Sequence, residues 1–457
     1  MEDILILSAA RTPIGSLNGS LAAYSAPQLG GKILAEALKR SGVAPESLGE
    51  VVMGNVLSGG VGQAPARQAM MQAQIPVSVG ASTVNKVCGS GLKAVMMAAQ
   101  SIALGEEDYA AAGGMESMSQ SPFLLEKARN GYRYGNGVLV DSILKDGLTD
   151  PYSNWHMGEC GELCAETHSI TREMQDAHAA ESYARALKAQ QSGAFSEEIF
   201  AIDGIALDEE PGRGKPEKIA RLKPAFKSGG SITAANASKL NDGAAALVLS
   251  SAKGAAGKKP LARIAGWATF SHEPKWFTTA PAGAIDKLLK KTGWAKESVD
   301  LFEVNEAFSV VALAVQKLAG LPSEKINVNG GAVALGHPLG ASGARILVTL
   351  FYALKARQGK RGIAAICLGG GRIRCRRHRK NLSFPKSFLY LICGFWAIPL
   401  ALSCRLQARP RSKNRERLSK KSRPAQTPFM GSTPDSAVSP LKKSQKKIFL
   451  SCKKTWS

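Results

Sequence analysis

Residues 81–104, ASTVNKVCGSGLKAVMMAAQSIAL, contain the alternation of elements that decides the fold. The first seven residues are rich in side chains that favour strands, and residues 92–104 have the alanine content and apolar spacing of a buried helix. Gly89 and Gly91 lie in the turn between them. A strand that passes through a glycine turn into an apolar helix is the building unit of α/β folds with a largely parallel sheet.

The same alternation extends in both directions from this stretch. We expect a helix at 28–40 and, besides the strand at 81–87, strands at 4–7, 50–55, 109–113 and 244–250. Residues 117–237 break the rhythm with glycine-rich turns and a polar helix near 171–192. We interpret them as an inserted cap over the site.

The second half of the chain repeats the first. Residues 261–266, 298–307, 326–330 and 362–367 take the places of the first four strands, and a helix expected at 341–354 takes the place of 92–104. The sequence therefore predicts two pseudo-symmetric βαβ-type halves that face each other. Their expected bounds are 1–116, completed by 238–258, for the first half, 117–237 for the insertion and 259–371 for the second half.

Composition separates residues 372–457 from the rest of the 457-residue chain. With 44% hydrophobic and 21% charged residues, the chain is not disordered, collagen-like or wholly membrane-embedded. Its formal charge of +23 is concentrated in 372–457, which contains 22 lysines and arginines and two acidic residues, whereas 1–371 contains 37 basic and 34 acidic residues. Such asymmetry indicates a tail that binds nucleic acid or membrane, or translation in a wrong reading frame.

The internal repeat favours the wrong-frame interpretation of 372–457. The first half closes with the strand at 244–250, but RIRCRRHRK follows Gly371 where the second half needs its equivalent. Unpaired charges cannot leave water at low cost, so we expect the second half to lack its last strand. Losing about four inward side chains at about 2 kcal/mol each removes on the order of 8 kcal/mol, which predicts poor solubility and weak activity.

Two other interpretations of the tail fit its sequence less well. The apolar run at 388–403 has 16 residues, fewer than the roughly 20 that span a bilayer, and it contains Pro399. The basic clusters at 411–423 and 442–454 lack the order of a nucleic-acid-binding motif. We therefore expect an irregular or disordered tail, no nucleic-acid partner and no membrane association.

Cysteine usage and the first residues predict a reducing, cytoplasmic compartment. Eight cysteines in a chain of this length do not form a disulfide framework, and no Cys-x-x-Cys pair indicates a zinc ribbon. Residues 1–8 lack the basic region of a secretory signal. Cys160 and Cys164 lie four apart on an expected helix and are interpreted as packing residues, so we expect no metal site.

Cys88 and His337 are candidates for nucleophile and base. Cys88 precedes the helix at 92–104, where the helix dipole and free amides stabilise a thiolate. His337, in GHPLGASG at 336–343, occupies the equivalent junction of the second half, where it can take a proton from a facing thiol. The alternatives are a buried structural cysteine and a structural, hydrogen-bonded histidine.

Two further motifs end strands of the second half. Cys367, in CLGGG at 367–371, lies at the carboxyl end of a strand, where open α/β sheets bind ligands, or it is a small apolar filler there. Asn305, in NEAF at 305–308, offers an amide that can bind a water or an oxyanion. Asn-Glu is otherwise a common helix start.

Together these motifs resemble those of the thiolase family. VCGSG at 87–91, NEAF, GHPLGASG and CLGGG occur in the family's order and spacing, as do ARTPIG at 10–15 and GMESMS at 114–119. The resemblance covers residues 1–371 and stops at Arg372. It implies a thiolase-like fold.

The resemblance also implies a role for each catalytic candidate. Cys88 would be the acylated nucleophile, His337 its base, and Cys367 the acid or base that moves the α-proton of acetyl-CoA or protonates the leaving thiolate. A water on Asn305 would form one oxyanion hole with His337, and the backbone N–H groups of Cys88 and Gly369 would form the other. These roles require the sulfur of Cys88 within a hydrogen bond, or one water, of the His337 ring, with Cys367 opposite.

Substrate contacts follow from the same resemblance. WHMG at 155–158 is similar to the short-chain, biosynthetic branch, in which His156 and Met157 border the acyl pocket; the alternative for His156 is a loop histidine that caps backbone groups. Phe308 is a further expected contact. NAS at 236–238 with NDG at 241–243 is similar to a pantetheine-binding loop, so Ser238 is a candidate, and Arg221 or Lys223 would meet the nucleotide of coenzyme A.

The implied activity is condensation of two acetyl-CoA molecules to acetoacetyl-CoA and CoA, or the reverse thiolysis, as in acetyl-CoA C-acetyltransferases. Coenzyme A thioesters are the substrates, no cofactor is needed, and a homodimer or homotetramer is expected. One alternative is a degradative 3-ketoacyl-CoA thiolase with longer acyl chains, against which His156 and Met157 argue mildly. The other is an inactive, basic-tailed binding or membrane-associated protein.

Overall fold

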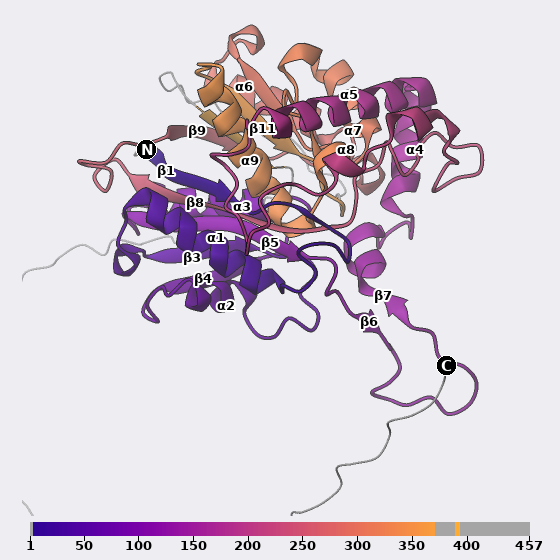
Figure 1. Ribbon diagram of the computed structural model, residues 1–457, viewed down its shortest axis with the longest axis horizontal. Helices are drawn as coiled ribbons and strands as arrows, with labels where there is room; N and C mark the ends of the chain where they lie inside the picture. The colour runs from indigo at the N-terminus through magenta and orange to yellow at the C-terminus, as the bar shows by residue number, and fades with distance from the viewer. Residues whose placement is uncertain (1–2, 371–388, 394–457) are drawn as a thin grey trace, which may run out of the picture. The chain divides into compact units, whose positions relative to one another are not determined.

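The computed structural model describes residues 3–370 and 389–393, and a sheet of ten strands connects both halves of the chain (Figure 1). The strand order is β10-β11-β12-β9-β1-β8-β5-β3-β4, with β2 paired to β8. These strands are β1 (Ile4–Arg11), β2 (Gly15–Ser16), β3 (Glu50–Gly54), β4 (Gly80–Val84), β5 (Tyr109–Ser117), β8 (Asn241–Ser251), β9 (Ala262–Ala268), β10 (Leu301–Val304), β11 (Gly362–Ile366) and β12 (Leu389–Cys393).

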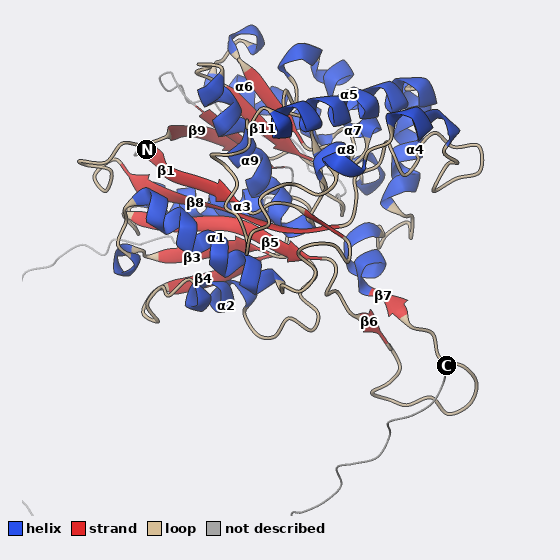
Figure 2. Ribbon diagram, viewed as in Figure 1, coloured by secondary structure: helices blue, strands red, loops and turns tan. Residues whose placement is uncertain are grey.

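In the described residues, helices cover the outer faces of this sheet (Figure 2). The α-helices are α1 (Ala26–Ser41), α2 (Pro65–Gln72), α3 (Ser90–Leu104), α4 (Met157–His168), α5 (Arg172–Gln191), α6 (Ala280–Thr292), α7 (Ser309–Ala319), α8 (Ala332–Leu335) and α9 (Leu339–Ala356). Helices α3 and α9 lie between the strands of the two halves of the sheet. Two segments, 87–104 and 339–356, have the length and hydropathy of a membrane span, but 67% and 83% of them are buried inside the protein, as in core helices.

The apolar residues form layers, with α3 and α9 in the middle. Strands of both halves contribute side chains to the cluster around these two helices. Alternate residues of the strands point the other way: Ala110 and Ala112 face the central helices, whereas Ala111 packs with α1 and α2. Helices α6 and α7 cover the outer face of the second half. The predicted α/β class is confirmed.

The two halves are joined more closely than the sequence predicts. Strands β1 and β9 pair antiparallel through Ile4–Ile264, Leu5–Arg263 and Ile6–Ala262. The two predicted halves therefore belong to one continuous hydrogen-bonded sheet.

The third strand expected in the second half, at 326–330, is reduced to a single bridge between Phe302 and Ile326. The side chain of Asn327 explains the difference. Its Oδ1 accepts from the backbone N–H of Val304 at 2.8 Å, and its Nδ2 donates to the backbone carbonyl of Val304 at 2.8 Å. The side chain thus takes the bonds that a neighbouring strand would make, and the chain turns away.

The last strand position of the second half is occupied, contrary to the expectation that it would be empty. Strand β12 lies between β11 and β9, the position that β8 has between β5 and β1 in the first half. Its direction differs: β8 is antiparallel to both neighbours, whereas β12 is parallel to both. Residues 372–388, where no strand was expected, lie outside the described residues.

The insertion contains β6 (Phe123–Leu124), β7 (Val140–Asp141), a π-helix (Ile143–Leu148), α4 and α5. A buried ion-pair cluster fastens it to β1. The guanidinium of Arg11 donates to both carboxylate oxygens of Asp208 at 2.7 and 2.8 Å and to Glu198 at 2.7 Å. Charge-assisted bonds of this geometry are strong, and they fix the insertion over the ends of the strands.

Candidate active site

Cys88 lies between β4 and α3, in a turn with a strained backbone. Val87 has φ of 48°, in the left-handed region that β-branched residues rarely adopt. Ser90 supports the turn, since its hydroxyl donates to the carbonyl of Val87 at 2.6 Å and accepts from the N–H of Lys86 at 2.8 Å. Gly89, the residue before α3, provides no side-chain cap. Cys88, which is 9% exposed, thus lies two residues before α3, whose first-turn amides receive no side-chain cap from Gly89.

Helices α3 and α9 cross through glycines just after Cys88 and His337. A Cβ added at Gly91 would lie 2.8 Å from the carbonyl oxygen of Gly340, and one added at Gly343 would lie 2.4 Å from the amide nitrogen of Leu92. Only glycine permits so close an approach. Because Cys88 and His337 each lie three residues before the contact between Gly91 and Gly340, the structure brings the starts of both helices together.

The hydrogen bonds of His337 define its tautomer. The hydroxyl of Ser342 donates to the carbonyl of Pro338 at 2.8 Å and lies 2.6 Å from Nδ1 of His337. Because the proton of this hydroxyl is donated to Pro338, the hydroxyl oxygen accepts a hydrogen bond from Nδ1–H of His337. Nε2 of the neutral ring therefore carries no proton. Among the described residues, Nε2 has no hydrogen-bond partner, although it is buried. This nitrogen is free to accept a proton.

Burial and the nearby Arg345 lower the pKa of His337 to about 3. The ring is therefore neutral over the ordinary pH range, as a base must be. Opposite a thiolate the imidazolium is stabilised, so proton transfer from a thiol remains feasible. The backbone N–H of His337 donates to Oδ1 of Asn241 at 2.9 Å, which fixes the loop before α9.

Cys367 follows β11 and is 1% exposed. Burial, and then the charge of Cys88, raise the pKa of its thiol above the ordinary range. The backbone N–H of Ala307 and the amide of Asn305 act in the opposite direction. These effects require proximity, so the structure brings Cys88, Cys367 and Asn305 together.

The amide of Asn305 is completely buried at the end of β10. Its electrostatic effect on Cys367 is not a well-formed hydrogen bond, because neither Oδ1 nor Nδ2 has a partner of ordinary geometry among the described residues. Buried amides are rarely left unpaired. Together with Nε2 of His337, this amide offers polar atoms to a water or a ligand.

A cavity of about 450 Å³ opens beside Gly369. A Cβ at Gly369 would approach Sδ of Met157 at 3.1 Å, so a larger residue would narrow the cavity. The lining combines the turn before Cys88, the π-helix and the end of β11: Val56, Ser58, Gly59, Asn85, Val87, Lys145, Asp146, Gly147, Thr149, Pro151, Met157, Gly369 and Gly370.

His156 caps α4, which was the structural alternative for this residue. Its Nδ1 accepts from the N–H of Gly158 at 2.9 Å, and burial lowers its pKa. Its ring also stacks on Phe226 at 4.6 Å, and Phe226 meets Phe308 edge-on at 5.9 Å. The three rings and the neighbouring Met157 thus form one apolar wall. This wall contains the predicted substrate contacts Met157 and Phe308 together with His156, which caps α4.

Ser238 and Arg221 have different surroundings. Ser238 is half-buried, and its N–H donates to the carbonyl of Ala307 at 2.9 Å, beside the bridge between Ala237 and Phe308. The structure therefore brings Ser238 to the wall of the site. Arg221 is exposed at the end of the 3-10 helix Pro216–Arg221 and contacts no other predicted site residue among those described.

Three residues at the site were not given roles from the sequence. Ser342 binds His337, and Phe226 completes the aromatic wall. Glu116 accepts from the backbone N–H groups of Val56 and Leu57 at 3.1 Å and of Gly340 at 2.7 Å, which ties the cavity wall to α9. Ser342 and Glu116 stand inside recognised motifs, whereas Phe226 stands in a polar loop with no signal.

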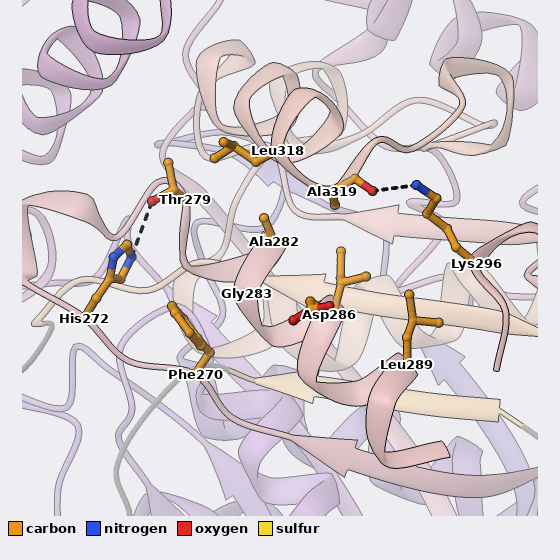
Figure 3. A pocket seen from close by; sticks show the side chains of 11 residues that line it. Phe270, His272, Thr279, Ala282, Gly283, Asp286, Leu289, Lys296, Leu318 and Ala319 are labelled. Atoms are coloured by element: carbon orange, nitrogen blue, oxygen red, sulfur yellow. Dashed lines mark hydrogen bonds between the residues drawn. The ribbon is translucent and has the colours of Figure 1, made fainter. Parts of the chain in front are cut away.

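A larger cavity of about 550 Å³ lies elsewhere, between α6 and the end of α7 (Figure 3). His272 and Thr279 face each other across 3.4 Å on one side, and Lys296 donates to the carbonyl of Ala319 on the other. None of the predicted site residues lines it. Size alone therefore does not identify the site.

Comparison with known proteins agrees with this geometry. Models of the thiolase N-terminal and C-terminal domains match residues 4–253 and 258–375. The chain belongs to the thiolase family. Acetyl-CoA acetyltransferase 2 of Arabidopsis thaliana is 53% identical over 383 residues, which cover 81% of this chain and 95% of that protein.

Two other relatives of this thiolase chain are similar over the same share of it. The cytosolic acetyl-CoA acetyltransferase ERG10 of Gibberella zeae is 49% identical, covering 81% of this chain and 96% of its own. The crystal structure of the Acat5 thiolase of Ascaris suum in complex with coenzyme A has a TM-score of 0.78 and 46% identity, covering 81% of this chain and 97% of its own.

Proposed function

We propose that this thiolase is an acetyl-CoA C-acetyltransferase, which condenses two acetyl-CoA molecules to acetoacetyl-CoA and CoA and catalyses the reverse thiolysis. The observation that carries the proposal is the meeting of two helix starts, one with Cys88 and one with a neutral His337, beside the second thiol of Cys367. Relatives with 49–53% identity bear the name acetyl-CoA acetyltransferase.

In the first step, Nε2 of His337 takes the proton of the Cys88 thiol, and the thiolate attacks the thioester carbonyl. Acetyl transfer to the sulfur releases CoA, whose thiolate takes the proton of the Cys367 thiol and leaves Cys367 as a thiolate. In the second step, Cys367 removes the α-proton of another acetyl-CoA, and the enolate attacks the acetylated Cys88. The carbon–carbon bond forms as the carbon–sulfur bond breaks and the Cys88 thiolate is regenerated.

Developing negative charge on the carbonyl oxygens needs placed donors. A water bound to the unpartnered amide of Asn305, with His337, supplies one set. The backbone N–H groups of Cys88 and Gly369 supply the other.

The substrate contacts lie along the apolar wall that His156, Met157, Phe226 and Phe308 form. His156, Met157 and Phe308 border the acetyl group, Ser238 contacts the pantetheine arm, and exposed Arg221, with Lys223, meets the phosphates of the nucleotide. The pair His156 and Met157, which is similar to that of the short-chain branch of the family, favours this activity over a degradative thiolase.

The active form is a homodimer or homotetramer in the cytoplasm. In the described sheet, β4 pairs with β3 on one side only, and its residues are half-exposed or exposed. An open edge of this kind is completed by the same strand of a second copy. The cytosolic relative supports the location.

We infer that residues 372–457 are the translation of a wrong reading frame. The support is the change of charge at Arg372 and the share of the chain, 81%, that each relative covers. The coding DNA tests this: another frame must encode an apolar strand directly after the three glycines. If no frame does, the tail is a genuine appendage.

Mass spectrometry of the full-length protein after incubation with acetyl-CoA tests the function. We expect an acetyl group on Cys88, none in Cys88→Ala, and acetoacetyl-CoA thiolysis lost in Cys367→Ala. Cys164→Ala, which changes a buried cysteine outside the site, is the matched control. Faster turnover of long 3-ketoacyl-CoA would favour the degradative enzyme, and an unmodified Cys88 would favour a binding protein.

A further inference from the structure

A second polar pair lies one layer beneath the predicted catalytic groups. Glu303 lies in β10, and Asn305 follows directly after the end of this strand, two residues further along the chain. Arg345 follows Ser342 by three residues in α9, so the two are neighbours on the helix surface. Long side chains on a helix point back toward its N-terminus, which directs Arg345 toward the turn that holds His337.

Arg345 and Glu303 are both buried, but they make few contacts that would offset their charges. Arg345 is 2% exposed and Glu303 1%, and Nη1 lies 3.8 Å from Oε2, beyond hydrogen-bonding distance. Among the described residues, none of the guanidinium nitrogens and neither carboxylate oxygen has a hydrogen-bond partner. In a low-dielectric interior, such a charge acts over a longer range than a paired one.

Other charges near Arg345 are already engaged with one another. Arg11 of β1 binds Asp208 and Glu198 of the insertion directly, and Thr349, one turn further along α9, donates to Glu198 at 3.2 Å. Glu303 is thus the acidic group that lies 3.8 Å from Arg345, while the charges of Glu198 and Asp208 also act on it.

Around His337 the other partners are mostly neutral. Ser342 and Asn241 bind its ring and its backbone, and the thiols of Cys88 and Cys367 belong to the same site. Among the described residues, two acidic groups lie near this turn. Glu116 is occupied by four N–H donors: the side-chain amide of Asn55 and the backbone of Val56, Leu57 and Gly340. Asp242, next to Asn241, accepts from the backbone N–H and the hydroxyl of Ser119.

We propose that Arg345 is a positioning residue which keeps the ring of His337 neutral until it receives the proton of Cys88, and that Glu303 offsets the arginine charge only when its carboxyl group is ionised. The proposal rests on the role of His337 as base given above. Arg345 is, after burial, the cause that lowers the pKa of His337. Burial raises the pKa of Glu303 to about 8 against the opposing effect of Arg345; Glu306 and Glu198 also raise it, and Arg357 lowers it. Below that pH Glu303 therefore compensates little of the arginine charge.

The rate at which iodoacetamide alkylates Cys88 depends on the equilibrium between the neutral thiol–imidazole pair and the thiolate–imidazolium pair. This rate can be measured without coenzyme A. The thiol proton moves to Nε2 of His337, and the thiolate displaces iodide as its sulfur bonds to carbon. Arg345 lies on α9 one turn from Ser342, which contacts the ring of His337, whereas Cys88 belongs to the turn before α3. We therefore expect the positive charge of Arg345 to disfavour the imidazolium more than it favours the thiolate. Removing that charge increases the thiolate fraction.

The experiment compares alkylation rates of Cys88 in the full-length protein and its variants at pH 7. We expect Arg345→Met to react about tenfold faster, which corresponds to one pKa unit. Arg345→Lys, which keeps the charge, should react at about the wild-type rate. Thr349→Val removes an uncharged polar group from the next turn of α9 and is the matched control, with an unchanged rate.

Glu303→Gln separates electrostatics from loosened packing. It should never react faster than the wild type, and at pH 9, where the wild-type carboxylate is charged, it should react more slowly. Equal rates for Arg345→Met and wild type, or acceleration in both Arg345→Met and Glu303→Gln, overturn the proposal. If Arg345→Met does not fold, faster alkylation of Glu303→Gln at pH 9 overturns it and slower alkylation supports it. Failure of acetyl transfer from acetyl-CoA instead counts against the proposed function alone.

Discussion

The imidazole of His337 has two nitrogens in different surroundings, and its chemistry depends on the difference. Nδ1 faces the hydroxyl of Ser342, and Nε2 has no partner among the described residues. The GHPLGASG motif predicts the position of His337. It does not predict that Ser342 determines the tautomer, because that contact requires the first turn of α9 to fold back on the histidine.

Substitution of Ser342 by alanine should lower kcat for acetoacetyl-CoA thiolysis by on the order of 10², the usual contribution of a well-placed general base. Without the hydroxyl, the proton distributes between both nitrogens. Ser342→Thr keeps a hydroxyl and should retain more activity than Ser342→Ala. Equal activity of Ser342→Ala and wild type contradicts the assigned tautomer.

Acid stability should depend on His337. Its folded pKa of about 3 lies below the unfolded value of about 6.5, so the unfolded state binds the proton first and stability falls as the pH drops below about 6.5. Between pH 7 and pH 5 the wild type should lose about 2 kcal/mol more than His337→Gln, which carries no titrating ring. Urea unfolding of both proteins at the two pH values measures this; parallel losses would show that the ring is not buried in its neutral form.

At the scale of elements, the close crossing of α3 and α9 holds the site together. Most helix and strand positions could be predicted from periodicity, because apolar spacing and glycine turns are local. The strand expected at 326–330 could not be excluded in this way, since its loss depends on Asn327 bonding to Val304 across the fold.

A methyl group at the helix crossing should destabilise the protein. Gly91→Ala places a Cβ 2.8 Å from the backbone of Gly340, and overpacking of this kind costs about 1–3 kcal/mol. Gly212→Ala is the control, because a Cβ there meets nothing within 4 Å. Thermal unfolding that is the same in both variants would argue against a close crossing.

Strand β12 should contribute to the sheet through its backbone. It lies between two strands, with Leu391 opposite Ala364 on one side and Trp267 on the other. Leu391→Pro removes a ladder donor and should lower the free energy of unfolding by about 3 kcal/mol or more. Leu391→Val preserves the donor and should have little effect. An equally stable Leu391→Pro protein would mean that β12 is dispensable.

At the scale of the whole molecule, the two halves share one sheet, but their last strands run in opposite senses relative to their neighbours. Parallel neighbours require a crossover connection, whereas the antiparallel arrangement of the first half does not. The last strand position of the second half is therefore filled by β12, whose direction relative to its neighbours differs from that of β8 in the first half.

A chimaera should reveal what the regular closing strand contributes. We expect replacement of 372–457 by the corresponding C-terminal residues of the Arabidopsis relative to raise the soluble yield, and the melting temperature by about 5 °C or more. Acetylation of Cys88 should also become more complete. A chimaera that melts at or below the temperature of the present chain would show that β12 closes the sheet equally well.

Sequence alone determined the α/β class, the internal repeat, the change of composition at Arg372 and the motifs around Cys88, His337, Asn305 and Cys367, because each is a local pattern of side chains. Tertiary structure decided the joining of β1 to β9, the filling of the last strand position by β12, the serine that orients His337 and the Arg345–Glu303 pair beneath it. These depend on contacts between residues far apart in the chain, whose energies arise only when burial removes water from both partners.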